Sequence, residues 1–138
     1  MVELDFGFIC ANIKYQENGM YSAEDIGLRG VLASSVPVSR PGLVVVIRMK
    51  TTAADVGPKR LGFAILDLDG KDVVEFEDKE WTPEPPPPGE FYRYDGVDFK
   101  LDRVSFPRFG EYTMIFRVDG VDFHRMIFNV RENNDSTL

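Results

Sequence analysis

Apolar and polar residues alternate with a period of two along most of this chain, and this alternation constrains the fold more than any other feature. The segment "GEYTMIFRVDGVDFHRMIFNV" alternates on both sides of Asp119-Gly120, a dipeptide that suits a two-residue hairpin because both positions tolerate a positive φ. A C-terminal β-hairpin is therefore expected. A two-residue turn predicts these cross-strand neighbours: Val118 with Val121, Arg117 with Asp122, Phe116 with Phe123, Ile115 with His124, and Tyr112 with Ile127.

The same pattern predicts a second hairpin in "KRLGFAILDLDGKDVVEFED" and strands in "LDFGFICANIKY" and "PGLVVVIRMKT". Residues 22–28 are ambiguous, because Ser22 and Asp25 resemble a helix-capping pair, whereas Gly27 and Gly30 would each cost a helix about 1 kcal/mol. We expect a turn followed by a strand over residues 27–35. About eight strands without a long helix predict an all-β fold, an antiparallel β-sandwich of immunoglobulin-like type, with a partly open barrel as the alternative.

A chain of 138 residues favours one domain, which we place at residues 1–131, with a flexible tail at 132–138. The proline-rich stretch at residues 83–88 would span roughly 19 Å as polyproline II, more than the roughly 10 Å between packed sheets. It therefore suits a crossover between two sheets. The alternative, a ligand for an aromatic groove, is less favoured because no Lys or Arg lies between Glu80 and Tyr92.

The negative charge is concentrated in one part of the chain. Residues 67–90 contain nine acidic and two basic side chains, which accounts for the whole net charge of −7. This balance argues against nucleic acid and against an anionic membrane as partners. The acidic sector would either attract a basic protein or keep an exposed strand edge unpaired. The acidic N-terminus, the absence of a long apolar run and the single cysteine lead us to expect a cytoplasmic protein.

Residues suited to catalysis are few, and we expect a non-enzyme without a cofactor. His124 is the only histidine and lies in a predicted strand, whereas Cys10 lies in an apolar run typical of a core position. Three aspartates, Asp67, Asp69 and Asp72, could present oxygens to Ca²⁺ if a two-residue turn set Asp67 opposite Asp72. A bulged turn would instead pair Asp67 with Lys71, and we therefore predict no bound metal.

Aromatic and arginine side chains gather after the proline stretch, where they either cover the ends of the sandwich or form an interface. The leading hypothesis is a non-catalytic protein-interaction or structural module, self-associating or binding another protein. The alternative is a small-ligand or carbohydrate-type binder, or an enzyme whose pocket is assembled from distant residues. The interaction candidates are Phe91, Tyr92, Arg93, Tyr94, Phe106, Arg108 and Phe109.

The layout of these segments resembles an uncharacterised family of small bacterial all-β domains. The segments that carry the resemblance are "ICANI", "GLRGVLASSVPV", "GLVVVIRM", "FAILDLDGKDV" and "FGEYTMIFRVDG", and it spans most of residues 4–131. The resemblance implies the architecture and a bacterial origin. It transfers no catalytic or binding residue.

Overall fold

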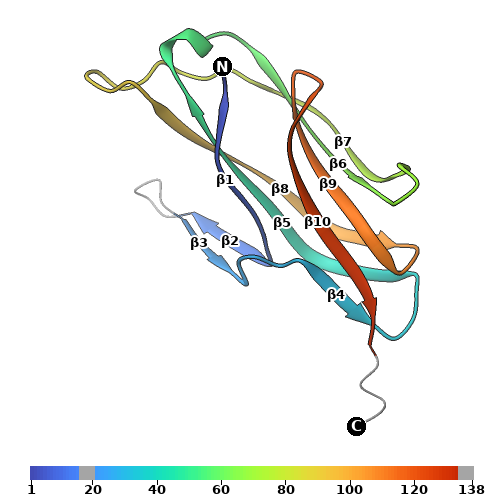
Figure 1. Ribbon diagram of the computed structural model, residues 1–138. Helices are drawn as coiled ribbons and strands as arrows, with labels where there is room; N and C mark the ends of the chain where they lie inside the picture. Colours follow the sequence, from blue (N-terminus) through green and yellow to red (C-terminus); the bar gives the residue numbers. More distant parts are fainter. Residues whose placement is uncertain (16–20, 134–138) are drawn as a thin grey trace.

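A computed structural model describes residues 1–15 and 21–133 of the chain (Figure 1). Within these residues the chain forms strands and one 3₁₀ helix, η1. The strands are β1 (Glu3–Cys10), β2 (Asn12–Tyr15), β3 (Tyr21–Glu24), β4 (Gly30–Ala33), β5 (Val38–Thr51), β6 (Lys59–Leu66), β7 (Asp72–Trp81), β8 (Arg93–Phe106), β9 (Gly110–Val118) and β10 (Val121–Glu132), and η1 spans Ala53–Asp55.

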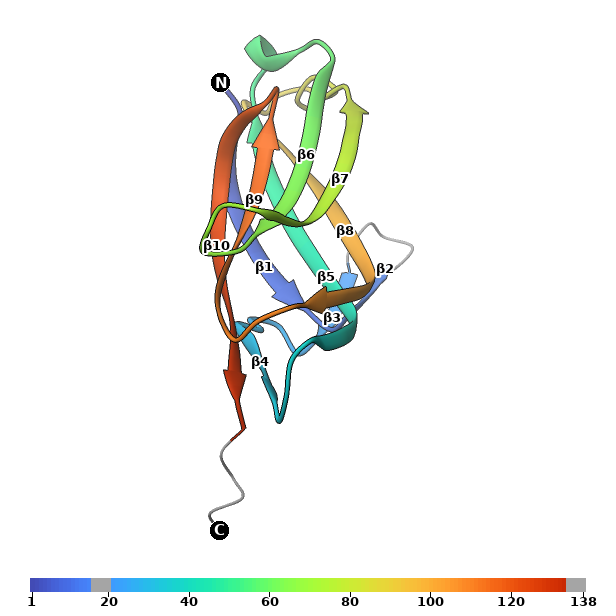
Figure 2. The ribbon, with the colours of Figure 1, turned by 90° about the vertical axis from the view of Figure 1, so that its right-hand side faces the viewer.

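The strands form two main sheets and a separate hairpin, so the all-β prediction is confirmed. One sheet has the order β1-β5-β8, the second has the order β4-β10-β9-β6-β7, and β2 pairs with β3 alone. Figure 2 shows the two main sheets as facing layers. The expectation of purely antiparallel pairing is wrong, because β4 pairs with β10 in parallel and makes the larger sheet mixed.

The region left ambiguous by the sequence, residues 22–28, is not helical. It contains the end of β3, and β4 then occupies the middle of the predicted strand at 27–35. At the other end of the chain, β10 continues through Glu132, one residue past the expected domain boundary. Residues 134–138 of the predicted tail lie outside the described residues.

The hairpin at Asp119-Gly120 forms as predicted, with φ values of 52° and 77° at its two turn residues. Val118 faces Val121, and Arg117 faces Asp122. Beyond these pairs the predicted register is wrong, because β10 has a bulge between Asp122 and His124 that shifts every later pair by one residue. The observed pairs are Phe116 with His124, Ile115 with Arg125, and Tyr112 with Phe128.

The hairpin between β6 and β7 adopts the bulged alternative rather than the two-residue turn. The amide of Gly70 donates to the carbonyl of Asp67 at 3.0 Å, and the amide of Asp67 donates to the carbonyl of Lys71 at 2.9 Å. Gly70 has a φ of 78°, which is the left-handed residue that this type of three-residue loop requires. Asp67 therefore lies opposite Lys71 and not opposite Asp72.

The proline-rich stretch connects the two main sheets, as its length predicted. It follows β7, at one edge of the five-stranded sheet, and precedes β8, at one edge of the three-stranded sheet. Its role as a crossover is therefore confirmed.

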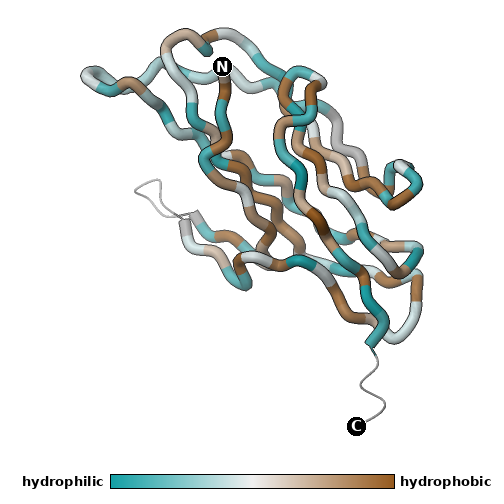
Figure 3. The backbone as a smooth tube through the Cα atoms, in the orientation of Figure 1, coloured by the Kyte–Doolittle hydropathy of each residue, from teal (hydrophilic) through white to brown (hydrophobic). Residues whose placement is uncertain are grey.

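The core lies between the two main sheets and is rich in aromatic rings. The rings of Phe63 and Phe99 stack with centroids 5.1 Å apart, and those of Phe106 and Phe128 stack at 5.3 Å. The hydroxyl of Tyr112 donates to the carbonyl of Arg108 at 2.7 Å, which fixes the chain just before β9. Figure 3 shows hydrophobic positions along the middle of β5 and mainly hydrophilic ones at the β6–β7 turn.

A smaller apolar cluster lies on the outer face of the three-stranded sheet. Its buried members are Cys10, Ile13, Val44 and Val46, and the β2–β3 hairpin lies over this part of the sheet. The hairpin covers only one end of the outer face. The other end is open, and it positions the candidate site.

Candidate functional site

The interaction residues expected from the sequence lie at opposite ends of β8. This strand has 14 residues and is therefore roughly 43 Å long. Phe106 at its far end is fully buried, because its side chain points between the sheets. The seven side chains therefore do not form one surface: Phe91, Tyr92, Arg93 and Tyr94 lie near the start of β8, and Phe106, Arg108 and Phe109 lie near its end.

The group at the start of β8 joins a larger set of side chains on the outer face of the three-stranded sheet. The guanidinium of Arg48 lies 5.0 Å from the ring centroid of Tyr94 and 5.6 Å from that of Phe6. The ammonium of Lys50 lies 3.8 Å from the ring centroid of Tyr92. We name this set the aromatic–cation face: Phe6, Phe8, Arg48, Lys50, Tyr92 and Tyr94.

The alternation of the strands explains why these side chains share a face. In β5, Val45, Ile47 and Met49 point into the core, so Arg48 and Lys50, at the alternate positions, point outward. Phe6 pairs with Arg48, and Tyr94 pairs with Lys50, which brings residues from three strands into adjacent rows. Sequence reasoning missed Phe6, Phe8, Arg48 and Lys50, although their period-two spacing is visible in "LDFGFIC" and "VVVIRMK".

The aromatic–cation face is half exposed rather than hidden in a cavity. Tyr92 is 43% exposed and Tyr94 is 44% exposed. Arg48 also lies 3.4 Å from the carboxylate of Asp5. An ion pair this exposed stabilises a fold by no more than about 1 kcal/mol, so its main effect is to hold the guanidinium between the rings. The face can therefore offer preoriented aromatic and cationic groups to a flat partner.

Arg93 takes part in a different contact beside this face. Its guanidinium lies 3.1 Å from Asp95 and 3.3 Å from Glu84 in the proline-rich crossover. Phe91, next to the crossover, is 84% exposed. The crossover is thus tied to the start of β8 by Arg93, while Phe91 extends into solvent.

Two of the three aspartates considered for calcium contact an arginine. Arg108 donates to Asp67 at 2.9 Å and to Asp69 at 3.0 Å, so its guanidinium lies where a cation would join these carboxylates. The amide of Lys71 also donates to Asp67, and this bond, together with Arg108, lowers the pKa of Asp67. Asp72 lies opposite Leu66 in β7. Among the described residues, no group of three or more His, Cys, Asp or Glu side chains could hold a metal ion.

The remaining reactive side chains are enclosed by apolar groups. Cys10 is fully buried in the outer cluster, and burial raises the pKa of its thiol. His124 is partly buried beside Gly7, and burial lowers the pKa of its imidazole. Neither arrangement resembles an activated nucleophile, which requires a lowered thiol pKa or an adjacent base. Among the described residues, no helix is long and apolar enough to cross a membrane.

The fold also occurs within a larger solved structure. It matches Pseudomonas fluorescens alkylpurine DNA glycosylase AlkC bound to DNA containing an abasic site analog, with a TM-score of 0.51 and 9% sequence identity. The match covers 94% of the present chain but only 30% of that chain. At this identity the likeness shows the fold alone.

This match corrects the expectation that nucleic acid is excluded as a partner. A protein that contains the same fold in 30% of its chain has been solved with DNA bound, so the fold occurs in a DNA-bound protein. The exclusion rested on the acidic excess of residues 67–90, which equals the net charge of the whole chain. A ligand instead responds to charges within about one Debye length, about 10 Å at 0.1 M salt, and most of the acidic excess belongs to one hairpin and the crossover.

The sequence comparisons assign the family. No curated protein matches the sequence. Residues 5–131 match DUF6941, which is described as a family of unknown function, and they include every strand of both main sheets apart from the ends of β1 and β10. With nearly the whole described fold matched, the chain belongs to the DUF6941 family.

Proposed function

We propose that this chain is a non-catalytic protein-interaction module and that it binds its partner through the aromatic–cation face. The observation that carries the proposal is the row of half-exposed rings and cations on an open sheet, with Arg48 held between Phe6 and Tyr94. Tyrosine and arginine are among the side chains most enriched at the energetic centres of protein interfaces. Their preorientation lowers the entropy that binding must remove.

Two finer assignments accompany this proposal. We assign the fold to the immunoglobulin-like type, supported by its two facing sheets and by the hydrogen bond from Tyr112 back to Arg108 before β9, which resembles a tyrosine corner. We assign the protein to the cytoplasm. The fully buried Cys10 supports this location, because a single free thiol needs no oxidising compartment.

A second candidate function is binding of single-stranded nucleic acid at the same face. The fold match to a DNA-bound glycosylase favours it. Proteins that bind single strands stack bases on aromatic rings and place cations beside the backbone, and Tyr92, Tyr94 and Lys50 could supply those groups. This candidate ranks second because Asp5 and Glu84 lie within the same region and would repel phosphates.

The experiment compares one double variant with a matched control. Tyr92→Ala combined with Tyr94→Ala removes two rings from the face, whereas Leu68→Ala removes an exposed apolar side chain, 72% exposed, from the β6–β7 turn. Proteins captured by immobilised wild type are identified and titrated individually. Loss of a hot-spot residue typically costs at least 2 kcal/mol, so we expect the double variant to bind a specific partner about 30-fold more weakly and Leu68→Ala to bind normally.

The same variants are tested in parallel with a single-stranded oligonucleotide and by sedimentation of the protein alone. Oligonucleotide binding that needs the tyrosines and weakens steeply with salt would establish the second candidate instead. Self-association that the double variant abolishes would identify a second copy of the chain as the protein partner. Equal binding by all variants would reject the aromatic–cation face.

A further inference from the structure

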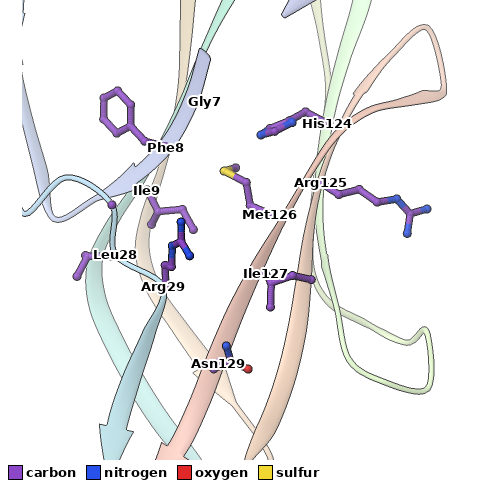
Figure 4. A pocket seen from close by; sticks show the side chains of 11 residues that line it. Gly7, Phe8, Ile9, Leu28, Arg29, His124, Arg125, Met126, Ile127 and Asn129 are labelled. Atoms are coloured by element: carbon purple, nitrogen blue, oxygen red, sulfur yellow. The ribbon is translucent and has the colours of Figure 1, made fainter.

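A cleft of about 460 Å³ lies between β1 and β10, on the side of the molecule where neither strand pairs with the other (Figure 4). Among the residues that the structure describes, β1 pairs with β5 alone, and β10 pairs with β9 on the side away from the cleft. The parallel pairing of β10 with β4 begins only at Asn129. In the described part of the chain, residues 124–128 of β10 therefore have no strand partner on the side of the cleft, and residues 124–127 line it.

The cleft has two closed ends. At one end His124 lies against Gly7, where a Cβ would fall 3.1 Å from the imidazole ring, so the two strands approach closely there. At the other end the segment before β4 bridges the sheets: the amide of Gly27 donates to Ile9 at 2.8 Å, and the amide of Asn129 donates to Arg29 at 2.8 Å. From His124 to Asn129 the open stretch is roughly 17 Å, enough for four or five extended residues.

The lining combines an apolar floor with a positive charge. Ile9 and Met126 point into the gap from opposite strands, and Arg29 extends beside Ile9 (Figure 4). Arg125 points the other way, where it pairs with Asp122. None of the residues lining the cleft is acidic. Across the described ranges, Arg29 makes no ion pair within 4 Å, although the chain as a whole is acidic.

We propose that this cleft binds an extended, acidic peptide segment of a partner protein, which inserts as an additional strand between β1 and β10. The unpaired edges would supply backbone hydrogen bonds along the segment, as in other cases of strand addition. An apolar side chain of the segment would lie on Ile9 and Met126. A carboxylate on a neighbouring residue of the segment would pair with the guanidinium of Arg29. This site adjoins the aromatic–cation face, since Phe8 belongs to both, but it does not depend on the function proposed for that face.

Charge complementarity decides in favour of an acidic segment. A basic segment would place its cations beside Arg29 with no carboxylate in the lining to compensate. A small anion would satisfy Arg29 but would leave the two strand edges unused. Only an extended chain with carboxylates uses all three features of the cleft.

The probe is a fluorescently labelled peptide of about eight residues in which valine alternates with glutamate, a length typical of one strand. Two controls carry lysine in place of glutamate, or a central proline that cannot donate to a strand. The test variant is Arg29→Gln and the matched control is Arg125→Gln. Both change one exposed arginine to the same neutral residue, but only Arg29 extends into the cleft. Equal melting temperatures would verify that both variants fold.

We expect the glutamate peptide to bind wild type and Arg125→Gln equally, and Arg29→Gln at least tenfold more weakly. The lysine and proline peptides should bind at least tenfold more weakly than the glutamate peptide. Equal binding of the lysine peptide, equal effects of the two variants, or no binding at millimolar peptide would overturn the proposal. The proposal would also be overturned if a single-stranded oligonucleotide bound wild type more tightly than Arg29→Gln while the glutamate peptide did not bind.

Discussion

Strand edges without a partner strand lie on two sides of the molecule, at β7 and at the cleft between β1 and β10. The residues along these two edges differ. On one side, β7 ends the five-stranded sheet and carries the exposed acidic residues Asp72, Asp78 and Glu80. On the other side, residues 6–10 of β1 have no charge, and the one arginine within residues 124–128 of β10 points away from the cleft. Charged edges resist pairing with other strands, whereas uncharged regular edges accept it.

The difference suggests separate roles for the two sides. The acidic residues that the sequence places around β7 fit edge protection, because β7 is an edge strand. The β1–β10 side lacks this protection and instead has a bounded cleft with one cation, Arg29, extending beside its apolar floor. The acidic edge of β7 would keep the protein soluble. The cleft between β1 and β10 would select a strand whose negative charge complements Arg29.

The largest effect is expected where β4 closes one end of the cleft. A Cβ at Gly30 would lie 2.2 Å from the carbonyl oxygen of Asn129, so Gly30→Ala must separate β4 from β10. We expect a loss of about 3 kcal/mol in the free energy of unfolding, measured by urea titration. Gly96→Ala is the control, because the atom nearest to a Cβ at this position, the carbonyl oxygen of Ile47, would be 4.0 Å away.

The free energy of unfolding of the Gly96→Ala variant should lie within about 0.5 kcal/mol of the wild-type value. Equal stability of Gly30→Ala and wild type would contradict the close approach of β4 to β10. If Gly30→Ala also self-associates, the longer open edge of β10 would be the cause, which would sharpen the contrast with β7.

A smaller effect on stability, with a clear effect on association, is expected at the protected edge. Asp78→Asn combined with Glu80→Gln removes two charges from β7, and Asp102→Asn combined with Glu111→Gln removes two exposed charges elsewhere. The free energy of unfolding of each double variant should differ from that of wild type by no more than about 0.5 kcal/mol per substitution. Only the β7 variant should form larger species, measured by analytical ultracentrifugation. Equal association of the two variants would remove the case for edge protection.

The smallest effect concerns the turn that leads into β7. The pKa of Asp67 is lowered by the amide of Lys71 and by Arg108, so its carboxylate stabilises the fold above the unfolded pKa of about 3.9, and this stabilisation is lost as the pH falls through the folded value. Asp67→Asn should therefore be less stable than wild type at pH 7, with a difference that shrinks below about pH 3.9, as urea unfolding would measure. A difference that grows in acid would contradict the Arg108 contact.

The local features of the fold could be predicted from the sequence, because turn chemistry and alternation act over short distances. Asp119-Gly120 set its hairpin correctly, and the proline-rich stretch indicated a crossover by its length alone. The bulge after Asp122 left no signal, since one extra residue can be absorbed without breaking the hydrophobic pattern. The parallel pairing of β4 with β10 was missed because it joins two short segments about 100 residues apart in the chain.

The candidate site was harder to predict than the fold. Aromatic density along the chain indicated Tyr92 and Tyr94, but the length of β8 separates them from Phe109. Arg48 joins them only through the pairing of β5 with β8. The cleft beside Arg29 lies between β1 and β10, which belong to different sheets and do not pair, and the alternation of one strand does not encode how two sheets are placed.

The contrast between the two edges is tested most directly by amide hydrogen exchange with and without the alternating valine–glutamate peptide. Strand addition forms new backbone hydrogen bonds, which slow the exchange of the amides involved. We predict slower exchange within residues 124–128 of β10 and residues 6–10 of β1, and unchanged exchange in β7. Slower exchange in β7, with no change in β1 and β10, would contradict the assignment of β7 as the protected edge and of the β1–β10 side as the binding edge.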